Sequence, residues 1–451
     1  MILGRLFGTD GIRGEANLPP MDGPTGFALG RAVVRTFGRG RGRTRVVLGK
    51  DTRLSGDMLE SAVASGATSE GGDVLRAGVL PTPGTAFLVQ DMEADAGVMI
   101  SASHNPFQDN GFKVFSSSGT KLSDGEEEAL EAVMLDDSSP STPPGSADVG
   151  RIVSLNDGRE RYGAFLRETF PPGLTLKGIR IVLDTANGAA FEIAPAVFRG
   201  LGACVDVIHD RPDGRNINDG CGSENTAGLE ERVRRTGAHA GLAFDGDADR
   251  LIAVDEAGRR LTGDQVLMIL ARGLQERGAP AGNLLVTTVM SNLGLVEACR
   301  RLGIQHHASM VGDRFVLEEM RRLGAVLGGE DSGHIIFLEH HTTGDGILSG
   351  LQLLACTVGK GVPLSEAASV MQVFPQVLVN VEVSAKPDLF EIPETASVIR
   401  GVEAELDGCG RVLVRYSGTQ RVCRVMVEGP SVETARQACG RIALAVKKVA
   451  G

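Results

Sequence analysis

Short runs of apolar and β-branched residues alternate with amphipathic stretches along the chain, and this alternation limits the possible folds more than any other feature. Residues 46–48 form such a run and precede a helical pattern at 58–66. Residues 179–184 form another and lead through a turn into an amphipathic stretch that ends near Gly202. Strands that alternate with helices are typical of α/β proteins. The sequence therefore predicts an α/β fold.

The chain is also long enough for several domains, because its 451 residues exceed the size at which one hydrophobic core keeps growing. Serine and proline residues at 140–144 interrupt the periodicity and indicate a boundary near residue 150. The strand–turn–helix pattern then repeats twice, with a helix at 293–302 in the third repeat. Beyond Pro375, alternating apolar and polar residues predict a strand with one solvated face. We expect three similar mixed-sheet α/β domains and a smaller C-terminal α+β domain around a central cleft, with bounds 1–150, 151–251, 252–370 and 371–451.

Charge and hydropathy narrow the range of partners. The net charge is −11 and no stretch is rich in lysine and arginine, which argues against nucleic acid and membrane surfaces as partners. No window approaches the roughly eighteen apolar residues of a membrane span, and the N-terminus lacks the apolar core of a signal peptide. Seven cysteines are scattered without metal-ligand spacing. We expect a cytoplasmic protein with reduced thiols.

A serine-containing motif follows the apolar run 97–100. It reads Ser101-Ala-Ser-His-Asn-Pro106 and is followed by Asp109-Asn-Gly-Phe-Lys113. Loops after strands are where open α/β sheets place ligand-binding residues, and a serine there is a candidate nucleophile. An ordinary serine turn explains the pattern equally well, and His104 cannot be told from a structural histidine by the sequence alone.

An acidic motif, Asp245-Gly-Asp-Ala-Asp-Arg250, follows the apolar run 241–244. Carboxylates that alternate with small residues allow three oxygen ligands to converge on one hard cation, for which Mg²⁺ is the natural choice. A solvated acidic turn is the alternative interpretation. The motif is not an EF-hand, because the downstream glutamate of that calcium loop is absent.

Three further motifs carry groups that bind sugars and phosphates. Residues 328–334 place a carboxylate, a hydroxyl and an imidazole on a glycine-rich turn, and such groups bind sugar hydroxyls. Residues 415–419, together with Arg424, combine guanidinium groups, hydroxyls and backbone amides that suit a phosphate. Arg13 lies between glycines and suits phosphate oxygens as well. The alternative interpretation of residues 328–334 and of residues 415–419 is an ordinary surface loop. No Walker A motif exists, so the motifs together favour phosphoryl transfer on a phosphorylated polyol without a nucleotide.

These motifs resemble the α-D-phosphohexomutase superfamily over essentially the whole chain. The sequences of residues 6–14, 100–107, 311–316 and 424–429 are similar to the branch that interconverts glucosamine 6-phosphate and glucosamine 1-phosphate. The resemblance implies an Mg²⁺-dependent isomerase with a phosphoserine and a bisphosphorylated sugar intermediate, acting on a phosphorylated hexosamine. That step leads toward UDP-N-acetylglucosamine and cell-wall precursors. Relatives of this kind are often dimers, so a homodimer is also expected.

The resemblance assigns a role to each motif. Ser103 would carry the phosphate and, with Asp245, Asp247 and Asp249, would hold Mg²⁺. The sugar hydroxyls would be bound by Glu330 and Ser332, and the non-reacting phosphate by Arg415, Ser417, Gly418, Thr419 and Arg424. The reacting end would be formed by Arg13, His104, Lys113, Arg250 and His334, with either Lys113 or His334 moving the proton of the sugar hydroxyl.

Several residues depart from the family pattern. Gln420-Arg421 replaces the usual Glu-Pro, Met310 replaces a lysine, Asp331 replaces a glutamine and Ala248 replaces a glycine. We hypothesise that Arg421 adds attraction for phosphate and that Asp331 either pairs with an ammonium group of the substrate or faces water. Two alternative functions follow: a mutase of phosphomannose or phosphoglucose in the same superfamily, and a phosphosugar-binding protein without turnover.

Overall fold

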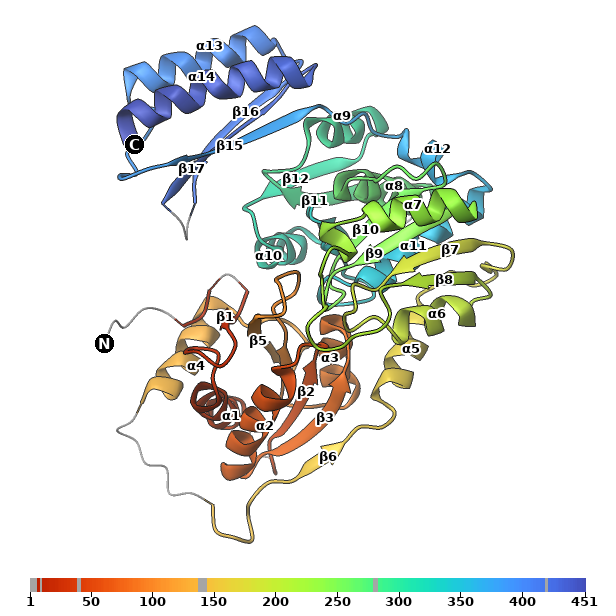
Figure 1. The fold of residues 1–451 in the computed structure, drawn as a ribbon, viewed down its shortest axis with the longest axis vertical. Helices are drawn as coiled ribbons and strands as arrows, with labels where there is room; N and C mark the ends of the chain where they lie inside the picture. The colour runs from red at the N-terminus through yellow and green to blue at the C-terminus, as the bar shows by residue number, and fades with distance from the viewer. Residues whose placement is uncertain (1–5, 9, 39–41, 137–143, 279–282, 418–420) are drawn as a thin grey trace. The chain divides into compact units, whose positions relative to one another are not determined.

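A computed structural model describes residues 6–8, 10–38, 42–136, 144–278, 283–417 and 421–451 of the chain (Figure 1). These residues form two compact units. The first comprises Met1–Met290 and Ile304–Ser369, and the second comprises Ser291–Gly303 and Val370–Gly451. Within the described ranges, the strands form four sheets, and no helix is both long and apolar enough to cross a membrane. The predicted α/β class with several mixed sheets is confirmed.

The first sheet has the strand order β1-β5-β4-β2-β3-β6, with β2, β3, β4 and β6 parallel and β1 and β5 antiparallel to their neighbours. Strand β6 pairs with β3, although the predicted boundary at residue 150 assigns its residues to the next domain. The strands are β1 (Ile12–Glu15), β2 (Arg45–Lys50), β3 (Asp73–Val79), β4 (Ala96–Ile100), β5 (Asp109–Ser116) and β6 (Ile152–Ser154).

Helices α1 (Gly23–Phe37) and α2 (Gly56–Ser69) pack closely against each other beside this sheet (Figure 1). Two glycines permit the close approach, because a Cβ atom at Gly30 would lie 2.1 Å from the Val63 oxygen and one at Gly66 would lie 2.0 Å from the Phe27 oxygen. The remaining helices of this domain are α3 (Thr82–Asp91) and α4 (Asp124–Leu135).

The second sheet has the order β10-β9-β7-β8, in which β7 pairs in parallel with β8 and β9, and β10 runs antiparallel to β9. Strand β10 begins at the predicted domain boundary, residue 251, yet it pairs with β9 along its whole length. The elements are α5 (Gly158–Glu168), β7 (Arg180–Asp184), α6 (Ile193–Gly200), β8 (Cys204–Ile208), the 3₁₀ turn η1 (Gly222–Glu224), α7 (Ala227–Thr236), β9 (Ala240–Phe244) and β10 (Leu251–Asp255).

The third sheet has the order β12-β11-β13-β14, with β14 antiparallel to β13 and the others parallel. Strand β12 was not predicted, because its segment contains two histidines and little apolar character. The elements are α8 (Gly263–Glu276), β11 (Leu284–Thr288), β12 (Gln305–Ser309), α10 (Asp313–Leu323), β13 (Leu327–Gly329), β14 (Ile335–Phe337), α11 (Gly346–Lys360) and α12 (Leu364–Ala368).

The second unit contains an antiparallel sheet of order β15-β17-β16, together with α13, α14 and α9. Helix α9 forms at the predicted residues, between β11 and β12 in the chain, and the division into compact units groups it with this sheet. Its first backbone amide, on Leu293, donates to Glu428 Oε2 at 3.0 Å, and the Asn292 side chain donates to the Phe374 oxygen at 2.9 Å. The elements are α9 (Leu293–Leu302), β15 (Gln376–Glu382), α13 (Pro393–Leu406), β16 (Arg411–Tyr416), β17 (Val422–Glu428) and α14 (Val432–Ala450).

Candidate active site

Ser103 lies in the loop that follows the buried strand β4, and its backbone is left-handed, with φ of +54°. That conformation is unfavourable by about 1–2 kcal/mol for a residue with a Cβ atom and persists only where neighbours fix it. The backbone carbonyl oxygen of Ser103 accepts hydrogen bonds from Arg53 Nη2 and Asn218 Nδ2, both at 2.9 Å. Its amide donates to Ser101 Oγ at 2.9 Å. The loop is therefore held from two domains.

Arg53 is the main support of this loop. Its guanidinium is buried and pairs with Asp51 at 2.9 Å, and Nη1 donates to the Pro106 oxygen at 2.8 Å. Nη2 donates to the oxygens of Ser103 and Asn105, both at 2.9 Å. One planar group thus fixes three carbonyls of the serine loop.

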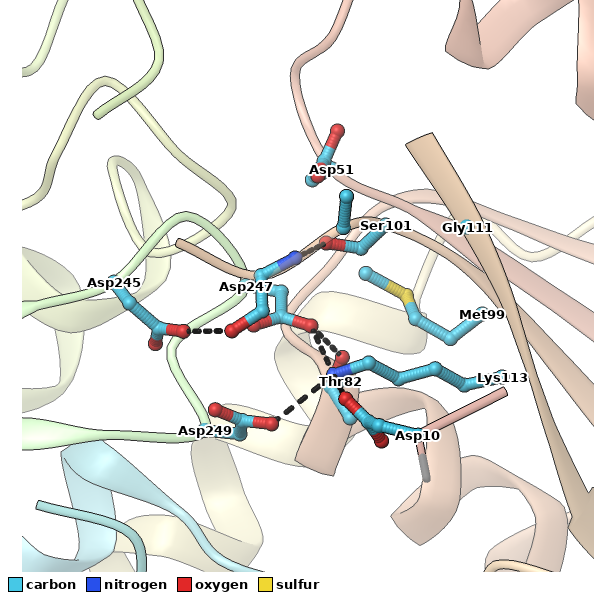
Figure 2. A network of polar contacts seen from close by, with 12 residues as sticks. Asp10, Asp51, Thr82, Met99, Ser101, Gly111, Lys113, Asp245, Asp247 and Asp249 are labelled. Carbon is cyan, nitrogen blue, oxygen red and sulfur yellow. Dashed lines mark hydrogen bonds and ion pairs between the residues drawn. The ribbon is translucent and has the colours of Figure 1, made fainter. Parts of the chain in front are cut away.

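The acidic motif forms the connection from β9 to β10. Asp245, Asp247 and Asp249 are buried, each offers one carboxylate oxygen, and these oxygens lie within 4.8 Å of one another. Figure 2 shows the carboxylates grouped together beside the serine loop. Burial and repulsion from Asp249 and Asp247 raise the pKa of Asp245 well above its usual value, and Asp247 Oδ1 is buried without a hydrogen-bond partner among the described residues. Crowded carboxylates with an unsatisfied oxygen fit a hard divalent cation such as Mg²⁺.

The serine loop and the acidic loop touch. Ser103 Oγ donates to Asp245 Oδ2 at 2.6 Å, and His104 Nδ1 lies 3.3 Å from the same hydroxyl. A Cβ atom at Gly246 would lie 2.6 Å from the Ser103 oxygen, so glycine permits this approach. The structure therefore brings together two motifs that lie in different domains of the chain.

Lys113, on β5, is a buried cation within this group of carboxylates (Figure 2). Its Nζ lies 2.8 Å from Asp247 Oδ2, 3.1 Å from Asp249 Oδ2 and 3.5 Å from Asp10 Oδ2. Burial disfavours the charge, but these carboxylates outweigh burial and hold the pKa of Lys113 well above its usual value. Thr82, at the start of α3, also donates to Asp247 Oδ2. Lys113 is thus a permanent positive charge.

His334 and Arg250 lie near the third aspartate of the acidic loop. His334 is buried, with Nδ1 3.8 Å from Asp249 Oδ1 and Nε2 3.5 Å from Asp313 Oδ2. Burial opposes a charge on the imidazole, but Asp249 and Asp313 outweigh it and raise the pKa of His334. Arg250 Nε lies 3.9 Å from Asp249 Oδ1. Both side chains therefore adjoin the third aspartate.

Arg13 and His104 complete the predicted reacting end. Arg13 forms an ion pair with Asp10, and its Nη1 lies 3.5 Å from the Ala102 oxygen in the serine loop. Burial and the Arg250 guanidinium lower the pKa of His104, so its imidazole is kept neutral. The five residues predicted for the reacting end all lie in the first unit, either within or next to the serine loop and the acidic loop.

The predicted sugar-binding turn connects β13 to β14. The Glu330 carboxylate accepts a hydrogen bond from the Gly312 amide at 3.0 Å, and burial raises the pKa of Glu330. Ser332 is exposed. Asp331 Oδ1 accepts from the Asp264 amide at 3.1 Å in the first turn of α8. A carboxylate is favourable at a helix N-terminus, so this hydrogen bond gives Asp331 a structural role. Neither hypothesis from the sequence included that role.

The predicted phosphate-binding motif lies in the second unit. Arg415 on β16 is paired in register with Arg424 on β17, and burial and the neighbouring Arg424 lower the pKa of Arg415. Arg415 Nε is buried and lacks a hydrogen-bond partner among the described residues. Two adjacent guanidinium groups with an unsatisfied donor favour binding of an anion. Ser417 continues the strand pairing through its amide, which donates to the Val422 oxygen at 2.9 Å, whereas Gly418 and Thr419 lie outside the described residues.

Three charged residues that the sequence analysis did not single out join the reacting end. Lys121 contacts both Asp10 and Asp313, and Asp10 also contacts Arg13 and Lys113. Asp10 and Asp313 lie inside two of the family-like segments, residues 6–14 and 311–316. Lys121 lies in no recognisable motif, so its contacts with the reacting end are evident only from the fold.

The sequence matches four domain families of phosphoglucomutase/phosphomannomutase: alpha/beta/alpha domain I over residues 4–140, domain II over 164–258, domain III over 262–374 and the C-terminal domain over 378–445. A phosphoglucosamine mutase from Syntrophobacter fumaroxidans is 55% identical over 449 residues and aligns over 100% of each chain.

Two solved structures show the same fold. A phosphoglucomutase/phosphomannomutase family protein from Burkholderia thailandensis aligns over 100% of this chain and 99% of its own, with a TM-score of 0.81 and 24% identity. An N-acetylphosphoglucosamine mutase from Aspergillus fumigatus, solved with GlcNAc-6P and magnesium, aligns over 99% of this chain and 96% of its own, with a TM-score of 0.71 and 18% identity.

Proposed function

The chain belongs to the phosphoglucomutase/phosphomannomutase family, and on that premise we propose that it interconverts glucosamine 6-phosphate and glucosamine 1-phosphate through a phosphorylated Ser103. The observation that carries the proposal is the 2.6 Å hydrogen bond from the Ser103 hydroxyl to Asp245 within a buried loop. The amino sugar is favoured over other hexoses because the Syntrophobacter fumaroxidans relative, 55% identical over its full length, is a phosphoglucosamine mutase.

We propose Mg²⁺ as the ion of the acidic loop, held by Asp245, Asp247, Asp249 and the phosphate on Ser103. When bound, the ion supplies positive charge against the oxygens of the transferring phosphoryl group. The magnesium in the Aspergillus fumigatus structure is consistent with that choice. The exact domain bounds, the cytoplasmic location and the homodimer expected from the sequence stay predictions.

The proposed reaction has two transfers. In the first, the phosphorus–Oγ bond of phosphoserine 103 breaks while a bond forms from phosphorus to the free hydroxyl of the sugar, which yields a bisphosphorylated sugar. In the second, after the sugar turns over, its other phosphoryl group returns to Ser103 Oγ and leaves a hydroxyl on the sugar. Lys113, Arg13 and Arg250 neutralise the charge that develops during each transfer.

The proton of the attacking sugar hydroxyl needs an acceptor, and we assign this role to His334. Lys113 is already protonated and is held so by three carboxylates, which makes it a poor base. The pKa of His334 is raised as well, but from the imidazole value of 6.5 rather than the lysine value of 10.5, so the neutral base is the more accessible of the two. His334 would hold this proton after the first transfer and give it to the sugar oxygen that is freed as a hydroxyl in the second.

The remaining predicted residues would bind the parts of the substrate that do not react. Glu330 and Ser332 would bind the sugar hydroxyls, and Arg415, Ser417, Gly418, Thr419 and Arg424 would bind the other phosphate. Such contacts supply binding energy away from the reacting atoms, which helps to hold the sugar in each of its two orientations.

The test is an assay of purified protein in Mg²⁺ with glucosamine 6-phosphate and a trace of glucose 1,6-bisphosphate. We expect glucosamine 1-phosphate to form, and Ser103→Ala to abolish turnover while the variant still folds. Matched reactions use glucose and mannose phosphates. Faster turnover of another sugar would assign the chain to a different substrate within the family, and binding without turnover of any sugar would favour a phosphosugar-binding protein.

A further inference from the structure

A second group of metal-ligating side chains lies in the second sheet's domain, separate from the three aspartates. It consists of Asp184, His209 and Cys221, which come from the end of β7, the residue after β8 and the residue before η1. One carboxylate oxygen, one imidazole nitrogen and the thiol sulfur lie within 4.8 Å of one another. Asp184 and Cys221 are buried and His209 is half-buried. The carboxyl ends of parallel strands, where two of these residues lie, are common ligand sites.

The Asp184 carboxylate is already oriented by the backbone. Oδ1 accepts from the Ala186 amide at 2.9 Å, Oδ2 accepts from the Gly222 amide at 3.0 Å, and His209 Nδ1 lies 3.0 Å from Oδ1. Hydrogen bonds of this kind commonly fix carboxylates that bind metals and leave further lone pairs available.

The backbone of His209 supports a role for its imidazole. Its φ is +53°, a left-handed conformation that glycine adopts without strain and that other residues adopt less readily. The His209 oxygen accepts from the Asn187 amide and from Thr185 Oγ1, both at 2.7 Å, so neighbours hold this conformation. Strained residues kept in place by their surroundings often serve a function of the side chain.

We infer that Asp184, His209 and Cys221 bind a transition-metal ion, with Zn²⁺ the best fit. Zinc prefers thiolate, imidazole and carboxylate ligands and is bound at many sites by three protein ligands and a water. Oxygen, nitrogen and sulfur ligands of a tetrahedral zinc are about 3.3–3.6 Å apart, so atoms that lie within 4.8 Å of one another can meet one ion after a shift of the side chains. The Cys221 thiol loses its proton to solvent as the sulfur–zinc bond forms. One aspartate and one thiolate then balance the charge of the ion.

The ion would brace the loop that supports Ser103. Asn218 lies between His209 and Cys221 in the chain, its amide donates to the Ala186 oxygen at 2.9 Å, and its side chain donates to the Ser103 oxygen at 2.9 Å. A metal bound to residues on both sides of Asn218 restricts the motion of this segment. The inference does not depend on the proposed reaction, because its test does not measure turnover.

The test is titration of the full-length protein with Co²⁺ in excess Mg²⁺, which is added to compete for the aspartate site. A thiolate ligand gives Co²⁺ a charge-transfer absorption in the near ultraviolet, whereas a site made only of carboxylates does not. We expect this absorption to saturate at one Co²⁺ per chain, to be displaced by Zn²⁺ and to vanish in Cys221→Ser. The exposed Cys204 supplies the control, because Cys204→Ser should leave the absorption unchanged.

His209→Gly is the deciding variant, because glycine suits the left-handed backbone and the protein should fold at least as well as the wild type. We expect its Co²⁺ affinity to fall by at least about 100-fold while the melting temperature of the metal-free protein is kept. Absence of a thiolate absorption in the wild type would overturn the inference. An absorption that stays unchanged in His209→Gly would also overturn the inference, because the thiolate would then bind Co²⁺ without the His209 imidazole.

Discussion

Lys121 of the first domain and Asp313 of the third form a mostly buried ion pair, with side chains 14% and 16% exposed. Lys121 also pairs with Asp10, which contacts Lys113, and Lys113 contacts Asp249. His334 closes the ring, because it lies near both Asp249 and Asp313. Positive and negative side chains from three domains of the first unit thus form a closed ring of charges around the candidate reacting end, in which each charge lies near one of opposite sign.

Lys121→Met should destabilise the protein by about 3 kcal/mol, because it leaves two mostly buried carboxylates without their shared cation. Urea unfolding of the variant and the wild type measures the loss. Arg322→Met is the matched control, since Arg322 is 59% exposed and its pair with Glu319 is expected to contribute under about 1 kcal/mol. Equal losses in the two variants would contradict the importance of the ring.

Ala248→Gly should stabilise the acidic loop. Ala248 has φ of +56°, so replacing it with glycine relieves a left-handed strain, and we expect a gain of about 0.5–1 kcal/mol. Ala243→Gly, in the extended strand β9, should instead lower stability by a similar amount. Calorimetric melting of the two variants distinguishes them, and a loss of stability in both would contradict backbone strain at Ala248.

Asp245→Asn should raise the melting temperature of the protein in EDTA while it lowers mutase activity in Mg²⁺ by at least about 100-fold. The gain, on the order of 1 kcal/mol, arises because one of three crowded buried carboxylates becomes neutral. Asp206→Asn is the control, because it removes a carboxylate that pairs with Arg232 and should lower stability slightly. A lower melting temperature of Asp245→Asn in EDTA would argue against a cation site.

His341 should make the protein sensitive to acid. Burial lowers its pKa to about 4, and as a neutral ring it donates from Nε2 to the Pro83 oxygen at 2.9 Å and accepts from the Thr342 amide at 2.7 Å. The unfolded chain takes up a proton near pH 6.5, before the folded protein does, so stability is lost as the pH falls from 6.5 toward 4.

The loss attributable to His341 is about 3 kcal/mol over that range. It is measured as the stability difference between the wild type and His341→Gln at several pH values, which separates His341 from Asp345. Burial raises the pKa of Asp345 to about 6, so its ionisation acts in the opposite direction. The difference should be largest at pH 7 and should shrink toward pH 4; a difference independent of pH would refute the assignment.

Arg53→Lys should lower kcat by about 10–100-fold with little change in KM, because an ammonium cannot hold three carbonyls of the serine loop in place. Arg45→Lys on β2 is the control, since Arg45 bonds to the Met92 oxygen away from that loop. Mass spectrometry of Ser103 phosphorylation gives a second measurement, and unchanged phosphorylation and kcat would exclude this role for Arg53.

The helices and strands could be predicted from the sequence more completely than the way in which they pack and pair. The helix at 293–302 forms at the predicted residues because its apolar period is local, but its partners, such as Glu428, lie far along the chain and could not be predicted. The same holds for strand β6, whose three residues carry no pattern of their own and are defined by pairing with β3.

The candidate site shows the same limit. Ser103 and the three aspartates stand in motifs whose residue types point to their chemistry, so they were predictable. Lys121 and Thr82 were not, because their importance arises from contacts with residues 111 to 192 positions away. Asp331 illustrates the reverse case, in which a residue singled out for ligand binding also has a partner in the fold.

The compensated ring of charges also has a consequence for synthesis on the ribosome. Lys113 is made 134 positions before Asp247, and Lys121 is made 192 positions before Asp313. At about 5–20 residues per second, the nascent first domain must wait roughly 7–40 s for the carboxylates of the later domains that pair with its buried lysines. During that interval the lysines are better solvated than buried. We therefore expect the final closure of the first domain to follow translation of the third.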